Sequence, residues 1–206
     1  MTRREFFWDA AAGAAEPFQA LTPLVVPVHQ VLDGRAKCAP QQLRYFLSSI
    51  WAEAVRDFSR CAIQFQTSEA TGEIRRSAGD RPIFIGLKRS ALNLVLTDHL
   101  PMYWDHGRML AGVTTIYEGY HLCVIALNYA HGHQIPFLSV NTCVHELLHA
   151  LLQDPLVTRP KWFQVSGREF RIDSYATRLW LFHDGGAIRN AAHAYLERLR
   201  SEMGAN

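Results

Sequence analysis

Residues 139–155 read SVNTCVHELLHALLQDP, and the interpretation of the whole chain depends on this stretch. Apart from two histidines and one glutamate, its central positions are apolar, which is typical of a helix packed into a core. We expect the helix to run from about Ser139 to Gln153, because the following Asp154-Pro155 pair favours a stop. Buried polar side chains are unfavourable unless something satisfies them, so the polar residues of this helix need partners.

The spacing of the two histidines gives these polar residues a chemical role. His145 and His149 are four residues apart, about one helical turn, so both imidazole rings leave the same face of a helix. Two such nitrogens can bind one zinc ion (Zn2+) at about 2.0–2.1 Å. Glu146 points away from that axis and can reach a water on the metal, where it can act as general base. The pattern predicts a catalytic zinc site; the alternative is a pair of core histidines with ordinary hydrogen bonds.

A catalytic zinc ion needs three protein ligands and one open position. Three acidic residues after the histidines could supply the third ligand. Asp154 ends the motif helix, and Glu169 lies at the start of the next expected helix, at about Gly167–His183. Asp173 follows one turn later on the same face. The residues by themselves leave these three candidates open.

The motif HELLH at residues 145–149, followed by ExxxD at residues 169–173, resembles the gluzincin metallopeptidases of the thermolysin type. This resemblance implies that Glu169 is the third zinc ligand. It also implies that Asp173 hydrogen-bonds a ligand histidine, with His145 as the expected partner.

Several residues near the motif differ from those of the thermolysin type and of the metzincin clan. Arg168 stands where the thermolysin type usually has asparagine. Leu152 and Pro155 stand where the metzincin clan has its turn glycine and its third ligand, and no methionine follows before Met203. Only the order of elements before the motif is similar to a metzincin upper half. We therefore expect a zincin-like fold with gluzincin ligands.

The residues before the motif predict most of a sheet. Strands are expected at 24–32, 62–66, 82–87, 92–96, 109–117 and 121–129, and a helix at about 41–60. Pro27 suggests that the first strand lies at an edge or carries a bulge. The polar stretch Ala70–Arg81 is expected to be a loop, and Glu118-Gly119 a hairpin turn. A last helix is expected at about Ala187–Glu202.

The fold class that follows is α+β. We expect a twisted, mainly antiparallel or mixed sheet with a backing helix, then an active-site helix and a helical C-terminal part.

Composition limits the partners of the protein. Hydrophobic residues make up 49% and charged residues 19%, which indicates one globular domain with a full core over residues 21–206. A formal net charge of +2 gives no field that would attract nucleic acid or an anionic membrane. No apolar run reaches the roughly 18 residues that a membrane span needs. The expected partner is a peptide or protein substrate, and the oligomeric state stays open.

Residues 1–20 form a separate N-terminal segment. Thr2–Phe7 resembles the start of a twin-arginine export signal, whereas an Ala-rich helix that frays is the alternative. Asp9 interrupts the short apolar stretch, which favours a cytoplasmic protein over a periplasmic or secreted one. The cysteines contain no C-x-x-C pair, and buried thiols are favoured over two disulfides. They are Cys38, Cys61, Cys123 and Cys143.

These observations predict a zinc metallopeptidase, a metalloendopeptidase of the HExxH type, that uses a metal-activated water with Glu146 as general base. In zincins an edge strand before the motif helix pairs with the extended substrate, and Leu122–Tyr129 is expected to be that strand. Two alternatives remain: a non-catalytic zincin-like binding or regulatory protein, and a zinc amidohydrolase acting on a non-peptide amide. The oxyanion-stabilising residue is unassigned, with four candidates: His131, His133, Tyr175 and His183.

Overall fold

The computed structural model describes ten stretches of the chain. They are residues 21–36, 40–76, 82–98, 104–105, 108–109, 112–127, 136–152, 162–165, 168–171 and 185–204. In chain order the elements are β1 (Leu24–Asp33), α1 (Pro40–Tyr45), a π-helical segment η2 (Phe46–Trp51), α2 (Ala52–Ser59), β2 (Ile63–Arg76), β3 (Pro82–Ile85), β4 (Leu92–Thr97), β5 (Trp104–Asp105), β6 (Arg108–Met109), β7 (Gly112–Tyr117), β8 (Tyr120–Ala126), α4 (Pro136–Leu152), β9 (Trp162–Val165), β10 (Arg168–Arg171) and α6 (Gly185–Gly204). The N-terminal segment 1–20 lies outside the described residues.

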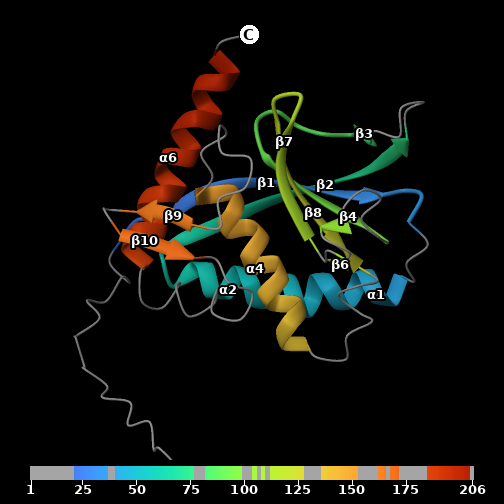
Figure 1. Cartoon of the computed structure of the whole chain (residues 1–206), viewed down its shortest axis with the longest axis horizontal. Helices are drawn as coiled ribbons and strands as arrows, with labels where there is room; N and C mark the ends of the chain where they lie inside the picture. Colours follow the sequence, from blue (N-terminus) through green and yellow to red (C-terminus); the bar gives the residue numbers. More distant parts are fainter. Residues whose placement is uncertain are drawn as a thin grey trace, which may run out of the picture.

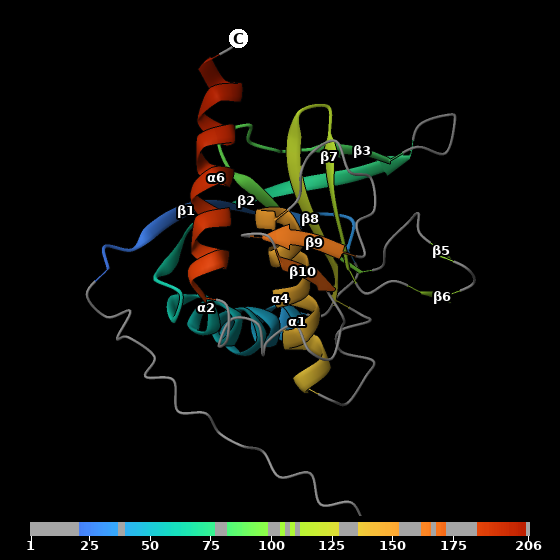
Figure 2. The ribbon, with the colours of Figure 1, turned by 60° about the vertical axis from the view of Figure 1, so that its left-hand side comes forward.

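A six-stranded mixed sheet organises these elements, in the order β3-β2-β1-β4-β8-β7. The strands β2, β1, β4 and β8 run parallel, and antiparallel pairs occur only at the two ends, β2–β3 and β7–β8. The α+β class is therefore confirmed, and of the two expected forms of the sheet the mixed one is found, with a parallel centre. The reason is that the helical connection between β1 and β2 is a crossover, which joins parallel strands. Figures 1 and 2 show the resulting curled sheet.

Pro27 does not mark an edge strand, because β1 lies between β2 and β4. Pairing of β1 with β2 starts at Leu24↔Ile63, whereas pairing with β4 starts only at Val28↔Leu92. Pro27 therefore lies in the part of β1 that has a neighbouring strand on one side. A missing N–H is tolerated there, as it is at a true sheet edge.

Strand β2 continues through residues expected to form a loop. It extends to Arg76 and pairs with β3 from Glu73↔Ile85 onward, so the loop expectation is wrong for residues 70–76. Gly72 makes this pairing possible, because a Cβ there would collide with the side chain of Val31 and the carbonyl oxygen of Ile85. A glycine that usually indicates a loop is here required for close backbone approach.

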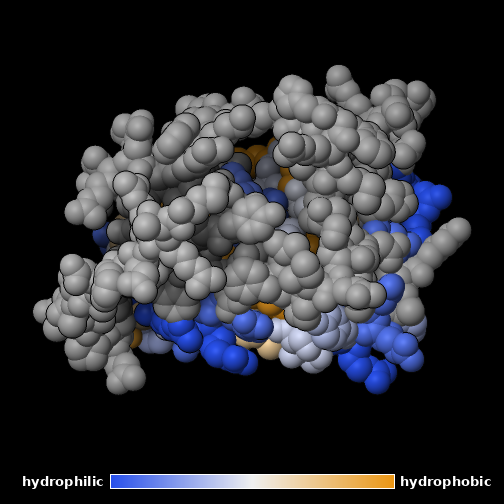
Figure 3. Space-filling view, turned by 60° about the horizontal axis from the view of Figure 1, so that its bottom comes forward, coloured by the Kyte–Doolittle hydropathy of each residue, from blue (hydrophilic) through white to orange (hydrophobic). Residues whose placement is uncertain are grey.

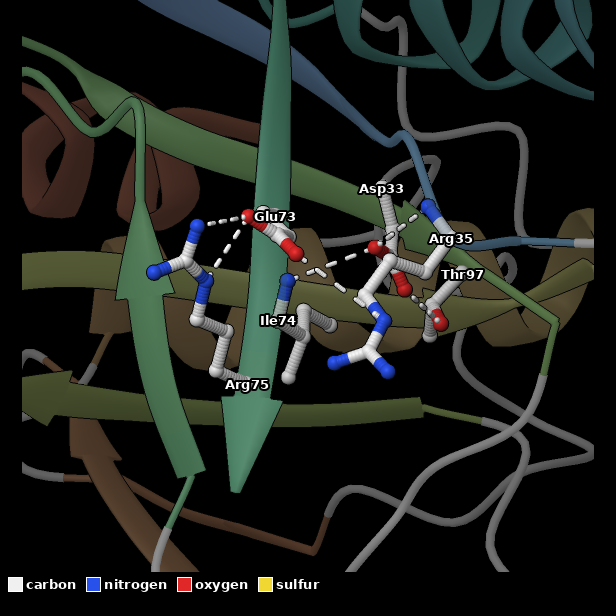
Figure 4. A network of polar contacts seen from close by, with 6 residues as sticks. All are labelled: Asp33, Arg35, Glu73, Ile74, Arg75 and Thr97. Carbon is white, nitrogen blue, oxygen red and sulfur yellow. Dashed lines mark hydrogen bonds and ion pairs between the residues drawn. The ribbon is translucent and has the colours of Figure 1, made fainter. Parts of the chain in front are cut away.

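A buried carboxylate ties three strands together at this end of the sheet (Figure 4). Asp33, at the end of β1, is 7% exposed. Its Oδ1 accepts the backbone N–H of Arg35 at 3.1 Å and of Ile74 on β2 at 3.3 Å. Its Oδ2 accepts the hydroxyl of Thr97 on β4 at 3.0 Å. Three donors therefore compensate this carboxylate for the water it has lost.

The hairpin between β7 and β8 is confirmed. Glu118 and Gly119 have φ angles of 49° and 79°, and they separate the paired residues Tyr117 and Tyr120. Two consecutive positive φ angles are those of a type I′ turn, whose twist matches that of the flanking strands.

The main core lies between one face of the sheet and the helices α2, α4 and α6. Figures 1 and 2 show the three helices on the same side of the sheet. Four apolar residues of α4 are almost completely buried: Val144, Leu147, Leu148 and Leu151 are each at most 1% exposed. The opposite face carries a smaller apolar cluster around Val95 and Val124. The helix expected at residues 139–153 is therefore confirmed as a core helix.

The helical stretch expected at 41–60 is also confirmed, as the succession α1, η2 and α2. Its inward side contributes Phe46, Ile50 and Phe58 to the core. Its outward positions, such as Arg44 and Arg56, are exposed. In Figure 3 hydrophilic side chains gather along the lower edge of the view, with apolar atoms visible between them.

The segment after the motif departs from expectation. The helix expected from Gly167 does not start there, because β9 and β10 form an antiparallel pair with Arg168 opposite Val165 and Glu169 opposite Gln164. Two short runs with aromatic residues, separated by two residues that end in glycine, favour a hairpin, and this local signal prevailed. The rest of that expected helix lies outside the described residues. The last helix is confirmed as α6.

None of the helices in the described part of the chain is both long enough and apolar enough to span a lipid bilayer.

Candidate metal centre on helix α4

The two histidines of the motif meet on one face of α4. Their Nε2 atoms are 3.1 Å apart, and the ring centroids lie 4.6 Å apart with the ring planes at 81°. Two nitrogens that bind one zinc ion at about 2.0–2.1 Å with a tetrahedral angle lie roughly 3.3 Å from each other. The 3.1 Å contact is a hydrogen bond between the rings of His145 and His149, and the same separation would let both nitrogens bind one ion once the shared proton is lost.

The environment of His149 keeps its ring neutral. Burial and, to a smaller extent, the charge of neighbouring His145 together lower the pKa of His149 to about 3. A neutral imidazole offers a lone pair, which is the form that binds a metal ion. The lowered pKa of His149 and the distance between the two rings thus both favour metal binding.

Glu146 lies against β7 and is 5% exposed. The hydroxyl of Thr114 donates a hydrogen bond of 2.7 Å to its Oε2. Burial raises the pKa of Glu146 to about 7, although the Thr114 hydrogen bond lowers it in part. A carboxylate with a pKa near neutrality can both accept and return a proton, which is what a general base must do.

Gly112, also on β7, completes the surroundings of this carboxylate. A Cβ at this position would lie 2.6 Å from Cγ and 2.9 Å from Oε1 of Glu146. Sequence reasoning missed both Gly112 and Thr114 because neither belongs to the motif. Only the placement of β7 beside α4 brings them to Glu146.

The strand expected to receive substrate is not at an edge. The predicted segment Leu122–Tyr129 corresponds to β8, which is paired with β4 on one side and β7 on the other. Its backbone groups are therefore engaged, and it cannot add a further strand. The edge position belongs to β7, whose one partner in the described part of the sheet is β8.

The third ligand is not placed. Glu169 lies in strand β10, not on a helix, and its side chain is outside the described part, as are Asp154 and Asp173. Among the residues that the structure describes, no group of three His, Cys, Asp or Glu side chains could hold a metal ion. The four oxyanion candidates also lie outside these ranges.

Three cysteines are buried thiols, as expected. Cys61, Cys123 and Cys143 form no disulfide, whereas Cys38 lies outside the described residues. Burial raises the pKa of the Cys61 thiol to about 11 and raises the pKa of the other two as well. These thiols are protonated at neutral pH, which makes them poor metal ligands and poor nucleophiles in this state.

Comparisons with models of known protein families, with curated proteins and with solved structures gave no match to this chain. The case for a function therefore rests on the chemistry of α4 and of the strand beside it.

Proposed function

We propose that this protein is a zinc-dependent hydrolase that cleaves peptide bonds. The observation that carries the proposal is the convergence of the His145 and His149 Nε2 atoms, 3.1 Å apart, beside a buried carboxylate on the adjacent residue. A zinc ion, when bound, would lower the pKa of a bound water to about 7 and polarise the substrate carbonyl.

His145 and His149 would hold the ion, with Glu169 as the third ligand and Asp173 supporting a ligand histidine. The position of Glu169 on a strand departs from the thermolysin-type arrangement, so its ligation is proposed from the resemblance of the HExxH and ExxxD motifs alone. Asp173 and Asp154 are the alternative third ligands.

Glu146 would accept a proton from the attacking water and return it to the leaving amine. Its pKa of about 7 supports both transfers at neutral pH, because neither the acid nor the base form is strongly favoured. The C–N bond would thus break, and the nitrogen side of the peptide would leave as a neutral amine.

The edge strand β7 would pair with an extended substrate through main-chain hydrogen bonds. Such pairing gives affinity that tolerates many side chains, which suits a polypeptide substrate. An antiparallel edge strand packed against the motif helix also supports a zincin-like fold, as expected from the sequence.

The test is metal analysis of the purified full chain, together with hydrolysis of an unstructured protein with and without a chelator. We expect one zinc ion per chain, loss of hydrolysis with the chelator and recovery on adding zinc. Glu146→Gln should keep the zinc and lose turnover. A wild-type chain that binds no zinc, or a Glu146→Gln chain that is as fast as wild type, would sink the proposal.

The burial of Glu146 favours one second candidate, a non-catalytic zincin-like protein that binds a partner. In that case zinc would be bound, but no polypeptide would be cleaved by wild type. Hydrolysis of small amides without cleavage of polypeptides would instead indicate a zinc amidohydrolase.

A further inference from the structure

Thr114 makes two contacts to one residue of the motif helix. Its Oγ1 lies 2.7 Å from Oε2 of Glu146 and 2.9 Å from the backbone carbonyl oxygen of the same residue. The hydroxyl has one proton, and the carboxylate is the stronger acceptor when it is charged. Because both acceptors belong to Glu146, the hydroxyl fixes the side chain relative to its own backbone.

Gly112 restricts the same carboxylate from a second direction. Residues two apart on a strand share a face, so Gly112 and Thr114 both face α4, whereas Thr115 faces the other way. The missing side chain of Gly112 leaves the space that Cγ and Oε1 of Glu146 occupy. The glycine therefore provides the room for the carboxylate, and the threonine provides the direction.

The donor itself is held rigidly. Thr114 pairs with Cys123 on β8, and Cys123 is fully buried in the main core. A β-branched side chain has few favourable χ1 rotamers, so the backbone of β7 sets the direction of the hydroxyl. A misplacement of about 1 Å at a reacting group can slow an enzyme by about 100-fold. Loss of a rigid hydrogen-bond donor to the general base should therefore lower kcat measurably.

We propose that Thr114 is a positioning residue that orients the carboxylate of Glu146 for proton transfer. This inference rests on the proposed function, and it assigns part of the machinery to a strand outside the HExxH motif. Thr114 acts through Glu146 and needs no contact with substrate. A purely structural hydrogen bond would affect stability and leave turnover per folded molecule unchanged.

The test compares Thr114→Val, which removes the hydroxyl and keeps the shape, with Thr114→Ser, which keeps the hydroxyl. We expect Thr114→Val to lower kcat by about 100-fold while KM and the zinc content stay at the wild-type values. Thr114→Ser should recover most of kcat. The matched control is Thr115→Val on the other face of β7, which should keep the wild-type kcat.

An active wild type with unchanged kcat in Thr114→Val would overturn the positioning role and leave the proposed function standing. Equal loss in Thr114→Val and Thr114→Ser would also overturn it, because the hydroxyl would then not be responsible. A wild type with no zinc and no hydrolysis would end both inferences together. If the valine variant does not fold, Thr114→Ala removes the same hydroxyl, and a wild-type kcat in that variant refutes the role.

Discussion

Two buried carboxylates, Asp33 at the end of β1 and Glu146 on α4, have different surroundings. Asp33 receives three hydrogen bonds, two of them from backbone N–H groups, whereas Glu146 receives its side-chain hydrogen bond from Thr114 within the described residues. Both are buried, at 7% and 5% exposure. The three donors hold the Asp33 side chain between the strands, whereas Glu146 has one described donor and burial raises its pKa to about 7. Burial alone therefore does not separate an acid that holds strands together from one that is proposed to act as a base.

The largest expected effect separates the two carboxylates by activity. Glu146→Gln should reduce kcat by at least about 100-fold, because the proposed general base is lost. Asp33→Asn should keep kcat per folded molecule but lower the free energy of unfolding by about 1–3 kcal/mol, since the amide cannot satisfy all three donors. Urea unfolding and single-substrate kinetics on both variants measure the difference. Equal losses of kcat in both variants would show that the two carboxylates do not differ in role.

Gly112→Ala tests the space beside Glu146. The added Cβ would lie 2.6 Å from Cγ of Glu146, so we expect a loss of about 1–3 kcal/mol in stability and a lower kcat at unchanged zinc content. Gly204→Ala at the end of α6 is the control, because nothing lies within 4 Å of a Cβ there. A Gly112→Ala protein with wild-type stability and kcat would show that the contact relaxes without consequence.

Thr97→Val is the counterpart of Thr114→Val at the other carboxylate. It removes one of three donors to Asp33, and we expect a loss of about 1 kcal/mol in the free energy of unfolding. No change in zinc content or in KM is expected, because Asp33 lies away from α4. A changed zinc content, measured on the folded variant, would contradict the separation of the two regions.

The smallest expected effect concerns a third buried acid, Cys61. Its pKa is about 11 in the folded protein against 9.0 for an ordinary thiol, so the folded state keeps its proton between these values while the unfolded state loses it. Stability from this site is therefore complete below pH 9 and falls as pH rises toward 11, by roughly 0.8 kcal/mol between pH 7 and 9.5. The free energy of unfolding, measured by urea unfolding at several pH values in this range, should fall less with pH in Cys61→Ala than in wild type. Parallel pH profiles for both proteins would refute the assignment.

Local patterns were sufficient for some elements and not for others. The apolar spacing of α4 and the Glu118-Gly119 turn depend on neighbours in sequence, and both were predictable. Gly72 was misinterpreted because its role, close approach to Val31 and Ile85, arises from strands that the sequence does not order. A helix was expected from about Gly167, but residues 168–171 pair with β9 as strand β10, and this pairing again depends on a second strand.

The candidate site divides in the same way. His145, Glu146 and His149 were predictable because one turn of helix places them. Thr114 is 32 residues away from Glu146, and nothing in its own sequence context distinguishes it from Thr115. Its role depends on which strand lies beside α4, and this is decided by the packing of the whole sheet.

The spacing of the histidines has a consequence for how preparations of this protein are judged. One turn of helix presents both ring nitrogens, whereas the contact between Thr114 and Glu146 forms only after β7 has been laid onto the sheet. A partly folded chain could thus still capture zinc, weakly, through a local turn. Metal content by itself would then overstate the fraction of competent molecules, and active-site titration would be the sounder measure of quality.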